Sequence, residues 1–209
     1  MLKRLIFVLA LALCPLGALA QVNFVPQIGV NSANLRQNTY TAAILKLVPE
    51  GTTATDFFCI SAGTTKSIHI NQIRLSGTGT LTTTPIYLNH NSTLDTGTAA
   101  VAATYGPVAY PLASTEPPAT AVVVAYNATG GNPTIGGTAT TLRTGNLTVG
   151  AIGTTTGAQD RLFWDFGSSQ EAYNAHLFIP KNTTEQICLN LASTSITAVL
   201  EGYIEWTEY

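Results

Sequence analysis

Carboxylates near the end of the chain are the first residues whose spacing suggests chemistry. The segment EGYIEWTEY places Glu205 and Glu208 three residues apart, and Glu201 precedes them. A glycoside hydrolase needs two carboxyl groups that face each other across a cleft at roughly 5–10 Å. In a strand, Glu201 and Glu205 share one face and Ile204 and Trp206 the other. We therefore interpret the glutamates as a charged outer face that keeps the last strand soluble.

Histidine and serine offer no recognisable catalytic or metal-binding pattern. His69, His90 and His176 are the only histidines, and none has the short spacing of a typical metal site. No serine lies in a Gly-x-Ser-x-Gly elbow. A triad of Ser61, His69 and Asp56 would have to be assembled in space. We expect three surface histidines, no catalytic residue, no metal site and no cofactor.

Aromatic residues beside an acid suggest a ligand site. The segment LFWDFG surrounds Asp165 with Phe163, Trp164 and Phe166. Alternation places Leu162, Trp164 and Phe166 on one face of a strand, and Phe163 and Asp165 on the other. We favour a core or a subunit interface for Trp164, with contact to a sugar ring as the alternative. The candidate ligand-binding residues are Trp164, Tyr173 and Tyr126.

Two cysteines remain after the leader, and they could form one disulfide. An exported chain meets an oxidising compartment, where a Cys59–Cys188 bridge would add up to ~4–5 kcal/mol by closing a long loop. The alternative is two free, buried thiols. Alternation puts Cys59 on the face of Phe57, and Cys188 on a more polar face with Gln186 and Asn190. The two faces do not match, so both alternatives stay open.

The first twenty residues read as a secretory signal. Two basic residues precede the apolar run 5–13, which is too short to span a bilayer. Ala-Leu-Ala at 18–20 predicts cleavage before Gln21. Lipidation of Cys14 and an uncleaved anchor are the alternatives. We predict a signal peptide at 1–20, an extended arm at 21–39 and one β domain at 40–209.

The charge balance excludes several classes of partner. Removing the two basic residues of the leader from the nine Lys and Arg leaves seven against 11 Asp and Glu. Nucleic acids and anionic membranes attract clustered Lys and Arg, which this chain lacks. No second apolar run reaches membrane length, so we expect no membrane span in the mature chain.

Threonine, β-branched and aromatic residues recur between glycine- and proline-rich turns, which favours an all-β fold. Apolar residues nowhere follow a helical period over three turns. We predict a single β-sandwich, jelly-roll-like, with about ten strands, no substantial helix and the last strand well inside its sheet. The expected strands lie at 40–48, 56–61, 66–76, 82–89, 120–126, 140–149, 161–166, 175–179, 185–192 and 198–207.

Alternation also predicts a bulge in the segment KSIHINQIRL. Ile68 and Ile70 face one way, but Ile73 breaks step with Ile70. One extra residue in a strand indicates a β-bulge. The isoleucines should belong to the core, and His69 and Asn71 should face outward.

Seven segments of the chain carry a resemblance through their residues and their order: ATDFFCISAGTTKSIHINQIRLSGTGT, NSTLDTGTA, PATAVVVAYNA, NPTIGGT, WDFG, EQICLNL and the closing IEWTEY. This order resembles an uncharacterised family of small β-rich proteins of tailed phages and prophages, often encoded near virion structural genes. The resemblance covers most of the chain from Thr41 onward. It implies a non-enzymatic virion or surface component and supplies no catalytic residues. The signal peptide and the two cysteines depart from the family's pattern, and both favour export.

These observations predict a non-catalytic structural or surface-attachment protein that works as a homo-oligomer or within a virion or surface assembly. The alternative is a secreted carbohydrate-binding module with a glycan as its partner. A hydrolase that uses Glu205 or Asp165 is a third hypothesis. We expect an exported protein, with a virion location as the alternative, and no nucleic-acid partner.

Overall fold

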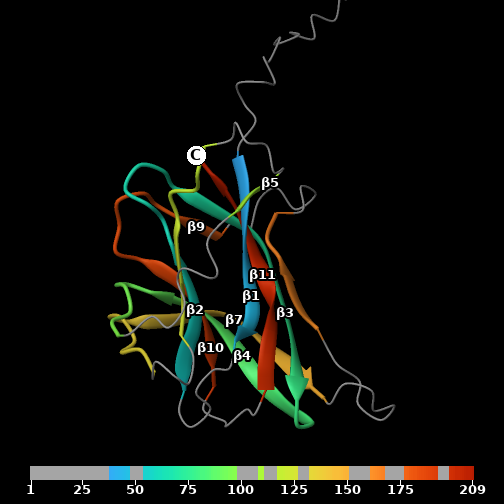
Figure 1. Cartoon of the computed structure of the whole chain (residues 1–209). Coiled ribbons are helices and arrows are strands. Elements are labelled where there is room, and N and C mark those ends of the chain that lie inside the picture. The colour runs from blue at the N-terminus through green and yellow to red at the C-terminus, as the bar shows by residue number, and fades with distance from the viewer. Residues whose placement is uncertain are drawn as a thin grey trace, which may run out of the picture. The chain divides into compact units, whose positions relative to one another are not determined.

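The computed structural model describes residues 38–47, 54–97, 108–110, 117–126, 132–150, 161–167, 177–192 and 198–209. These residues form eleven strands and no helix (Figure 1). They belong to one compact unit, Gln37–Tyr209. The predicted signal peptide lies outside the described residues, as does the predicted arm except for its last two residues, which belong to the first strand. A helix of the length and apolarity that a membrane crossing needs is not found among the described residues.

One sheet, called sheet A here, has six strands in the order β5-β1-β11-β3-β8, and β9 pairs with β3 beside β8. All of its pairings are antiparallel. Its strands are β1 (Asn38–Leu47), β3 (Ile68–Gly79), β5 (Val108–Tyr110), β8 (Leu162–Asp165), β9 (Leu177–Ile179) and β11 (Ala198–Glu208).

The other sheet, sheet B, has five antiparallel strands in the order β6-β2-β10-β4-β7. Its strands are β2 (Thr55–Ser61), β4 (Thr82–Asn91), β6 (Val122–Ala125), β7 (Ala139–Val149) and β10 (Gln186–Leu191). The strands that precede β4 pair, in reverse order, with strands that follow β7. Around the β4–β7 pair, β3 pairs with β8, β2 with β10 and β1 with β11.

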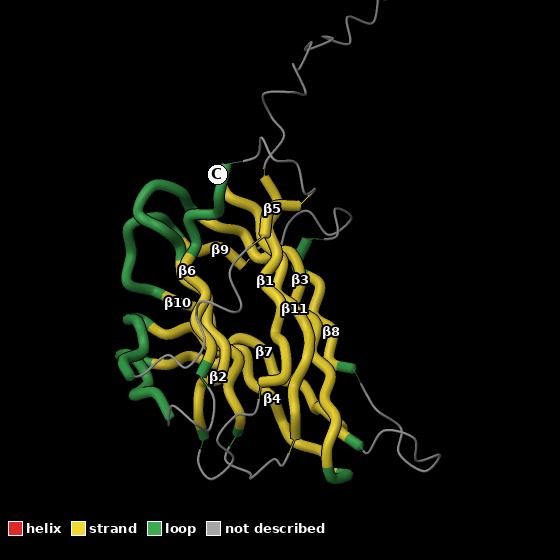
Figure 2. The backbone as a smooth tube through the Cα atoms, in the orientation of Figure 1, coloured by secondary structure: helices red, strands yellow, loops and turns green. Residues whose placement is uncertain are grey.

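The two sheets form neighbouring layers that share one hydrophobic core (Figure 2). Sheet A contributes Ile73 and Trp206 to this core, and sheet B contributes Phe58, Leu88 and Leu189. Each of these side chains is at most 2% exposed. The predicted all-β fold with two packed layers is confirmed.

Most strands appear where the sequence predicts them, and β11 lies between β1 and β3, which confirms its predicted interior position. The exception is β5 (Val108–Tyr110), which falls in a stretch predicted to be loop. It has only three residues and pairs with one edge of β1. A strand this short is specified by the neighbour that it pairs with, and its own alternation is too brief to predict it.

The predicted bulge in β3 is confirmed. Glu205 pairs with Gln72 and the next residue, Trp206, pairs with Ile70, which leaves Asn71 as the extra residue. Isoleucines on both sides of the bulge are buried, as expected. The bulge therefore keeps the core-facing residues inside while it shifts the outward-facing ones.

A second bulge, in β2, overturns the predicted face of Cys59. Leu189 pairs with Phe58 and Asn190 with Asp56, so Phe57 is the extra residue. Phe57 and Phe58 both join the shared core. Cys59 therefore shares a face with Asp56 and not with Phe57 as predicted, which places it on the polar face where Cys188 was expected.

Candidate functional site

The solvent-facing surface of sheet A carries a row of polar side chains across three strands. Gln72 on β3 pairs with Asp165 on β8 and with Glu205 on β11. These residues, with Asn71 and Gly167, line an open depression of about 360 Å³. Strand spacing puts the backbones of Asp165 and Glu205 roughly 10 Å apart. We call this surface, together with the aromatic residues described next, the sheet A face.

Hydrogen bonds hold the polar row in place. Gln72 Nε2 donates to Glu205 Oε2 at 3.0 Å, and Asn71 Nδ2 approaches Glu205 Oε1 at 3.4 Å. Asn71 also exchanges hydrogen bonds with the hydroxyl of Thr207 at 2.9 and 3.2 Å. The backbone N–H of Gly167 donates to Asp165 Oδ1 at 2.9 Å. The row is thus a pre-positioned set of amide and carboxylate groups on rigid strands.

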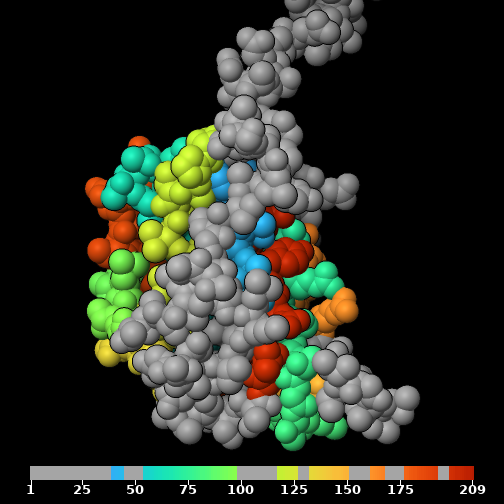
Figure 3. Space-filling model, viewed as in Figure 1, coloured from blue at the N-terminus to red at the C-terminus, as the bar shows by residue number. Residues whose placement is uncertain are grey.

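Exposed aromatic rings flank the depression. Phe163 on β8 lies opposite Arg74 and is 53% exposed, and Phe178 on β9 lies opposite His69 and is 49% exposed. The His69 ring contacts Phe178 edge-on at 4.9 Å and Tyr209 at 4.5 Å between ring centres. In Figure 3 the atoms of β11 (red), β3 (green) and β8 (orange) lie side by side on the right flank of the view.

Glu208 does not belong to this face, which corrects the prediction of a charged outer face for the closing glutamates. Its side chain is fully buried, whereas Glu201 on the same strand is exposed. Glu208 shares the inward parity of Ile204 and Trp206, so it points under the segment 117–121. The outward positions of Glu201 and Glu205 agree with the predicted alternation.

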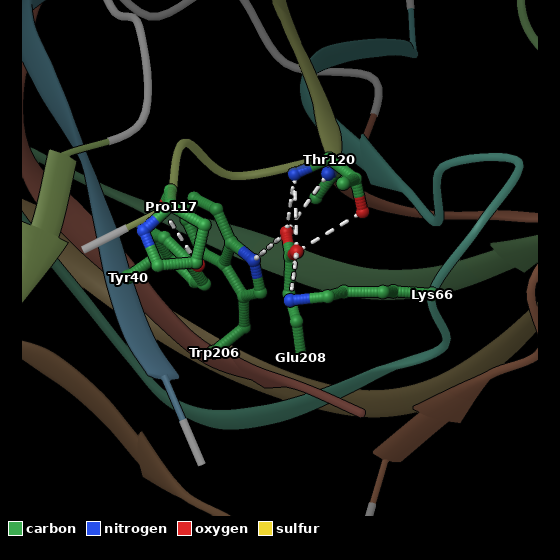
Figure 4. Close-up of polar contacts among 7 residues, drawn as sticks. Tyr40, Lys66, Pro117, Thr120, Trp206 and Glu208 are labelled. Atoms are coloured by element: carbon green, nitrogen blue, oxygen red, sulfur yellow. Dashed lines mark hydrogen bonds and ion pairs between the residues drawn. The ribbon is translucent and has the colours of Figure 1, made fainter. Parts of the chain in front are cut away.

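The Glu208 carboxylate is held by donors from three segments (Figure 4). The backbone N–H groups of Thr120 and Ala121 donate at 2.8 and 2.9 Å, and the Thr120 hydroxyl donates at 3.0 Å. Trp206 Nε1 donates at 3.3 Å, and Lys66 Nζ lies 3.8 Å away. Thr120, Ala121 and Lys66 lie far from Glu208 in the sequence, so the carboxylate joins distant chain segments and serves the fold.

On sheet B, Cys59 and Cys188 form a disulfide between directly paired positions of β2 and β10. Their Cα atoms are 4.1 Å apart, and both residues are buried. The bridge packs against Tyr126 and lies beside two carboxylates, Asp56 and Asp95. We call Asp56, Asp95 and the two cysteines the disulfide cluster.

Side-chain amides satisfy the carboxylates of the disulfide cluster. Asn91 and Asn190 donate to Asp56 at 2.7 and 2.6 Å. Asp95 accepts from Asn91 at 3.0 Å, from Gln186 at 2.5 Å and from the Gly136 backbone at 2.8 Å. Asp95 lies on the segment after β4, so this network ties that segment to the outer surface of sheet B.

Burial has a clear electrostatic consequence for this cluster. It raises the pKa of Asp56 to about 6, with a further contribution from the neighbouring Asp95, while the amides of Asn190 and Asn91 oppose the rise. Burial, with Asp95 and Asp56 nearby, also raises the pKa of Tyr126 to about 12.

The Asp56 pKa predicts a pH dependence of stability. A carboxyl whose pKa rises from 3.8 to about 6 on folding binds its proton more tightly in the native state. The free energy of unfolding should therefore fall as pH rises through this window, by roughly 1–2 kcal/mol between pH 5 and pH 7.5. Urea unfolding at both pH values measures it, with Asp56→Asn as the non-titrating comparison. An equal change in both proteins would contradict the assignment to Asp56.

The described residues bring together no catalytic triad and no histidine metal site. Ser61 and Asp56 lie on β2 of sheet B, whereas His69 lies on β3 of sheet A. His90 pairs with Glu185 at 3.5 Å, and His176 lies outside the described residues. Cysteine and aspartate atoms of the disulfide cluster gather within 4.8 Å. The two sulfurs are bonded to each other, however, and are not thiolate ligands.

Two of the three aromatic candidates for a sugar site lie among the described residues, and both are buried. Trp164 is 7% exposed and packs in the shared core, where its ring has no open face. Tyr126 is buried against the disulfide on sheet B. Tyr173 lies outside the described residues. The preference for a core position of Trp164 agrees with its burial.

Sequence reasoning did not select Asn71, Gln72 or Phe178, the residues that complete the sheet A face. The available signal was the outward parity of Asp165 and Phe163, which the structure bears out. Their partners come from β3 and β9, and only the pairing of these strands reveals them.

Comparisons of the chain with protein-family models, with curated proteins and with solved structures found no match. The candidate site therefore has to be interpreted from its own geometry.

Proposed function

We propose that the protein is a non-catalytic structural or surface-attachment protein that acts in several copies, and that it attaches through the sheet A face. The exposure of Phe163 and Phe178 around a polar depression carries this proposal. Aromatic side chains are enriched at protein interaction surfaces. Short, paired strands hold these side chains, which limits the entropy lost on binding.

The positions of the acids support a non-catalytic role. Glu208 and Asp56 are buried and engaged in hydrogen bonds that join chain segments. Asp165 and Glu205 stand on one open sheet surface and point the same way, whereas a glycosidase pair faces across the bond that it cleaves. A screen for glycosidase and esterase activity should therefore be blank. Activity that Glu205→Gln abolishes would overturn the non-catalytic proposal.

The path of the chain supports a jelly roll. The pairs β3–β8, β2–β10 and β1–β11 follow the β4–β7 pair in this order. This is the pairing of one long hairpin that is rolled into two sheets. Jelly rolls of two packed sheets are common in capsid and lectin domains. The resemblance to a phage protein family agrees with a virion component. The Cys59–Cys188 disulfide agrees with an exported one.

A cell-binding experiment tests the attachment role. Labelled full-length protein should bind intact cells of its source organism or host, and replacing both Phe163 and Phe178 by serine should remove most of that binding. Leu142, an exposed leucine on sheet B, provides the matched control as Leu142→Ser. Equal loss in the control variant, or no binding by the parent protein, would contradict attachment through the sheet A face.

Sedimentation velocity over a wide concentration range tests the assembly. We expect an oligomer whose size is unchanged by the serine substitutions on the sheet A face. A protein that stays monomeric at high concentration contradicts assembly into a homo-oligomer.

A further inference from the structure

We propose that the sheet A face binds a neutral oligosaccharide that lies along β3 between Phe178 and Phe163. This inference rests on the proposed attachment function and names its ligand class. It uses other residues than the aromatic candidates that the sequence suggested.

The two phenylalanines stand in one column beside β3. Phe178 lies opposite His69, and Phe163 lies opposite Arg74. Their partners are five positions apart with one residue in a bulge, which corresponds to roughly 13 Å along the strand. This separation suits a ligand of several linked rings rather than a single small molecule. The two aromatic residues would contact different units of the same chain.

A sugar ring has an apolar C–H face and hydroxyl groups around it, and these complement the aromatic and polar side chains of the sheet A face. The C–H groups of a pyranose form an apolar face that packs on an aromatic ring, whose π-surface is negative. Between the phenylalanines, Asn71 and Gln72 offer amides, and Asp165 and Glu205 offer carboxylates. Such planar groups hydrogen-bond adjacent hydroxyls, and bonds from hydroxyls to ionised carboxylates are among the strong ones.

Charge selects a neutral ligand. Two of the five residues that line the depression are carboxylates, and Arg74, opposite Phe163, is one cation beside them, so the formal charge along the ligand's path is net negative. An anionic sugar, such as a sialylated, sulfated or uronic one, would place like charges together in the depression. The balance of the whole chain, with 11 Asp and Glu against nine Lys and Arg, adds to that repulsion.

The test uses the full-length protein on an array that holds neutral oligosaccharides beside sialylated, sulfated and uronic ones, followed by calorimetric titration of the neutral glycans bound. We expect binding to neutral glycans only. Phe163→Ala, Phe178→Ala and Gln72→Ala should each weaken it about tenfold or more. The control is Leu142→Ala, which removes a somewhat less exposed apolar side chain on the other sheet and should leave the affinity unchanged. Unchanged circular dichroism spectra verify that the variants fold.

The remaining outcomes separate this inference from the proposed function. A blank array, or binding confined to acidic glycans, overturns the neutral oligosaccharide. Neutral binding that persists in all three variants overturns the location. If cell binding depends on Phe163 while the array is blank, the attachment proposal stands and its ligand is not a sugar. If Phe163→Ala instead dissociates an oligomer, the face binds a second copy, and both proposals fail.

Discussion

Replacing Glu208 by alanine should lower the free energy of unfolding by about 3–5 kcal/mol, because it leaves several donors without an acceptor and each unsatisfied buried group costs about 1–3 kcal/mol. The substitution leaves the N–H groups of Thr120 and Ala121 and the indole N–H of Trp206 without their acceptor. Lys66 loses its carboxylate partner as well. Urea unfolding followed by circular dichroism measures the change.

The same strand supplies the control for this experiment. Glu201 is exposed on β11, and Glu201→Ala should change the free energy of unfolding by less than about 0.5 kcal/mol. Glu208→Gln retains one carbonyl acceptor and should fall between the alanine variant and the parent protein. Equal stability of the Glu208→Ala and Glu201→Ala variants would show that the buried network contributes nothing to the fold.

Removing the disulfide should have a comparable effect. Cys59 and Cys188 are 129 residues apart in sequence, and a bridge that closes so long a loop restricts the unfolded chain. The double substitution Cys59→Ala and Cys188→Ala should lower the free energy of unfolding by about 3–5 kcal/mol. Denaturant unfolding of the non-reduced parent protein and of the double variant gives the difference.

Reduction supplies an independent control. A reductant should destabilise the parent protein to near the level of the double variant and should leave the double variant unchanged. Mass spectrometry after alkylation without reduction identifies the oxidation state. Two alkylatable thiols in protein purified from the exported fraction would refute the bridge and would weaken the argument for export.

The first prediction concerns a contact that fastens a segment outside the central strand pairs, and the second concerns a covalent link between the paired strands β2 and β10. Glu208 holds the segment that leads into β6, and Tyr40 bonds to Pro117 in the same segment at 3.0 Å. Asp95 holds the segment that follows β4 against sheet B, beside the disulfide. Neither cluster opens toward the sheet A face. Variants of the buried clusters should therefore alter stability, and variants of the sheet A face should alter binding.

Local alternation was sufficient to predict much of the fold. The period of two in the last strand correctly separated Ile204 and Trp206 from Glu201 and Glu205. The slip between Ile70 and Ile73 revealed the bulge at Asn71. These predictions succeed because successive side chains of a strand point to opposite faces, so a half-buried strand shows alternating apolar and polar residues in its own sequence.

Alternation failed where the neighbours carry no clear period. In DFFCIS, every residue of β2 is buried, so the sequence cannot indicate which phenylalanine is the bulged one. The register between β2 and β10 decides that Phe57 is the bulged residue, and this places Cys59 on the face opposite to Phe58. The burial of Glu208 similarly depends on the segment 117–121, which covers its carboxylate, and the residues next to Glu208 do not indicate this contact.

An all-β chain, most of its strands and the inward or outward direction of many side chains follow from local residue patterns. Which outward residues lie together depends on how the strands pair. Asp165, Gln72 and Glu205 form one row because β8, β3 and β11 are neighbours in the sheet. Pairing between segments far apart in the sequence is set by the packing of the whole core, and no local pattern contains it.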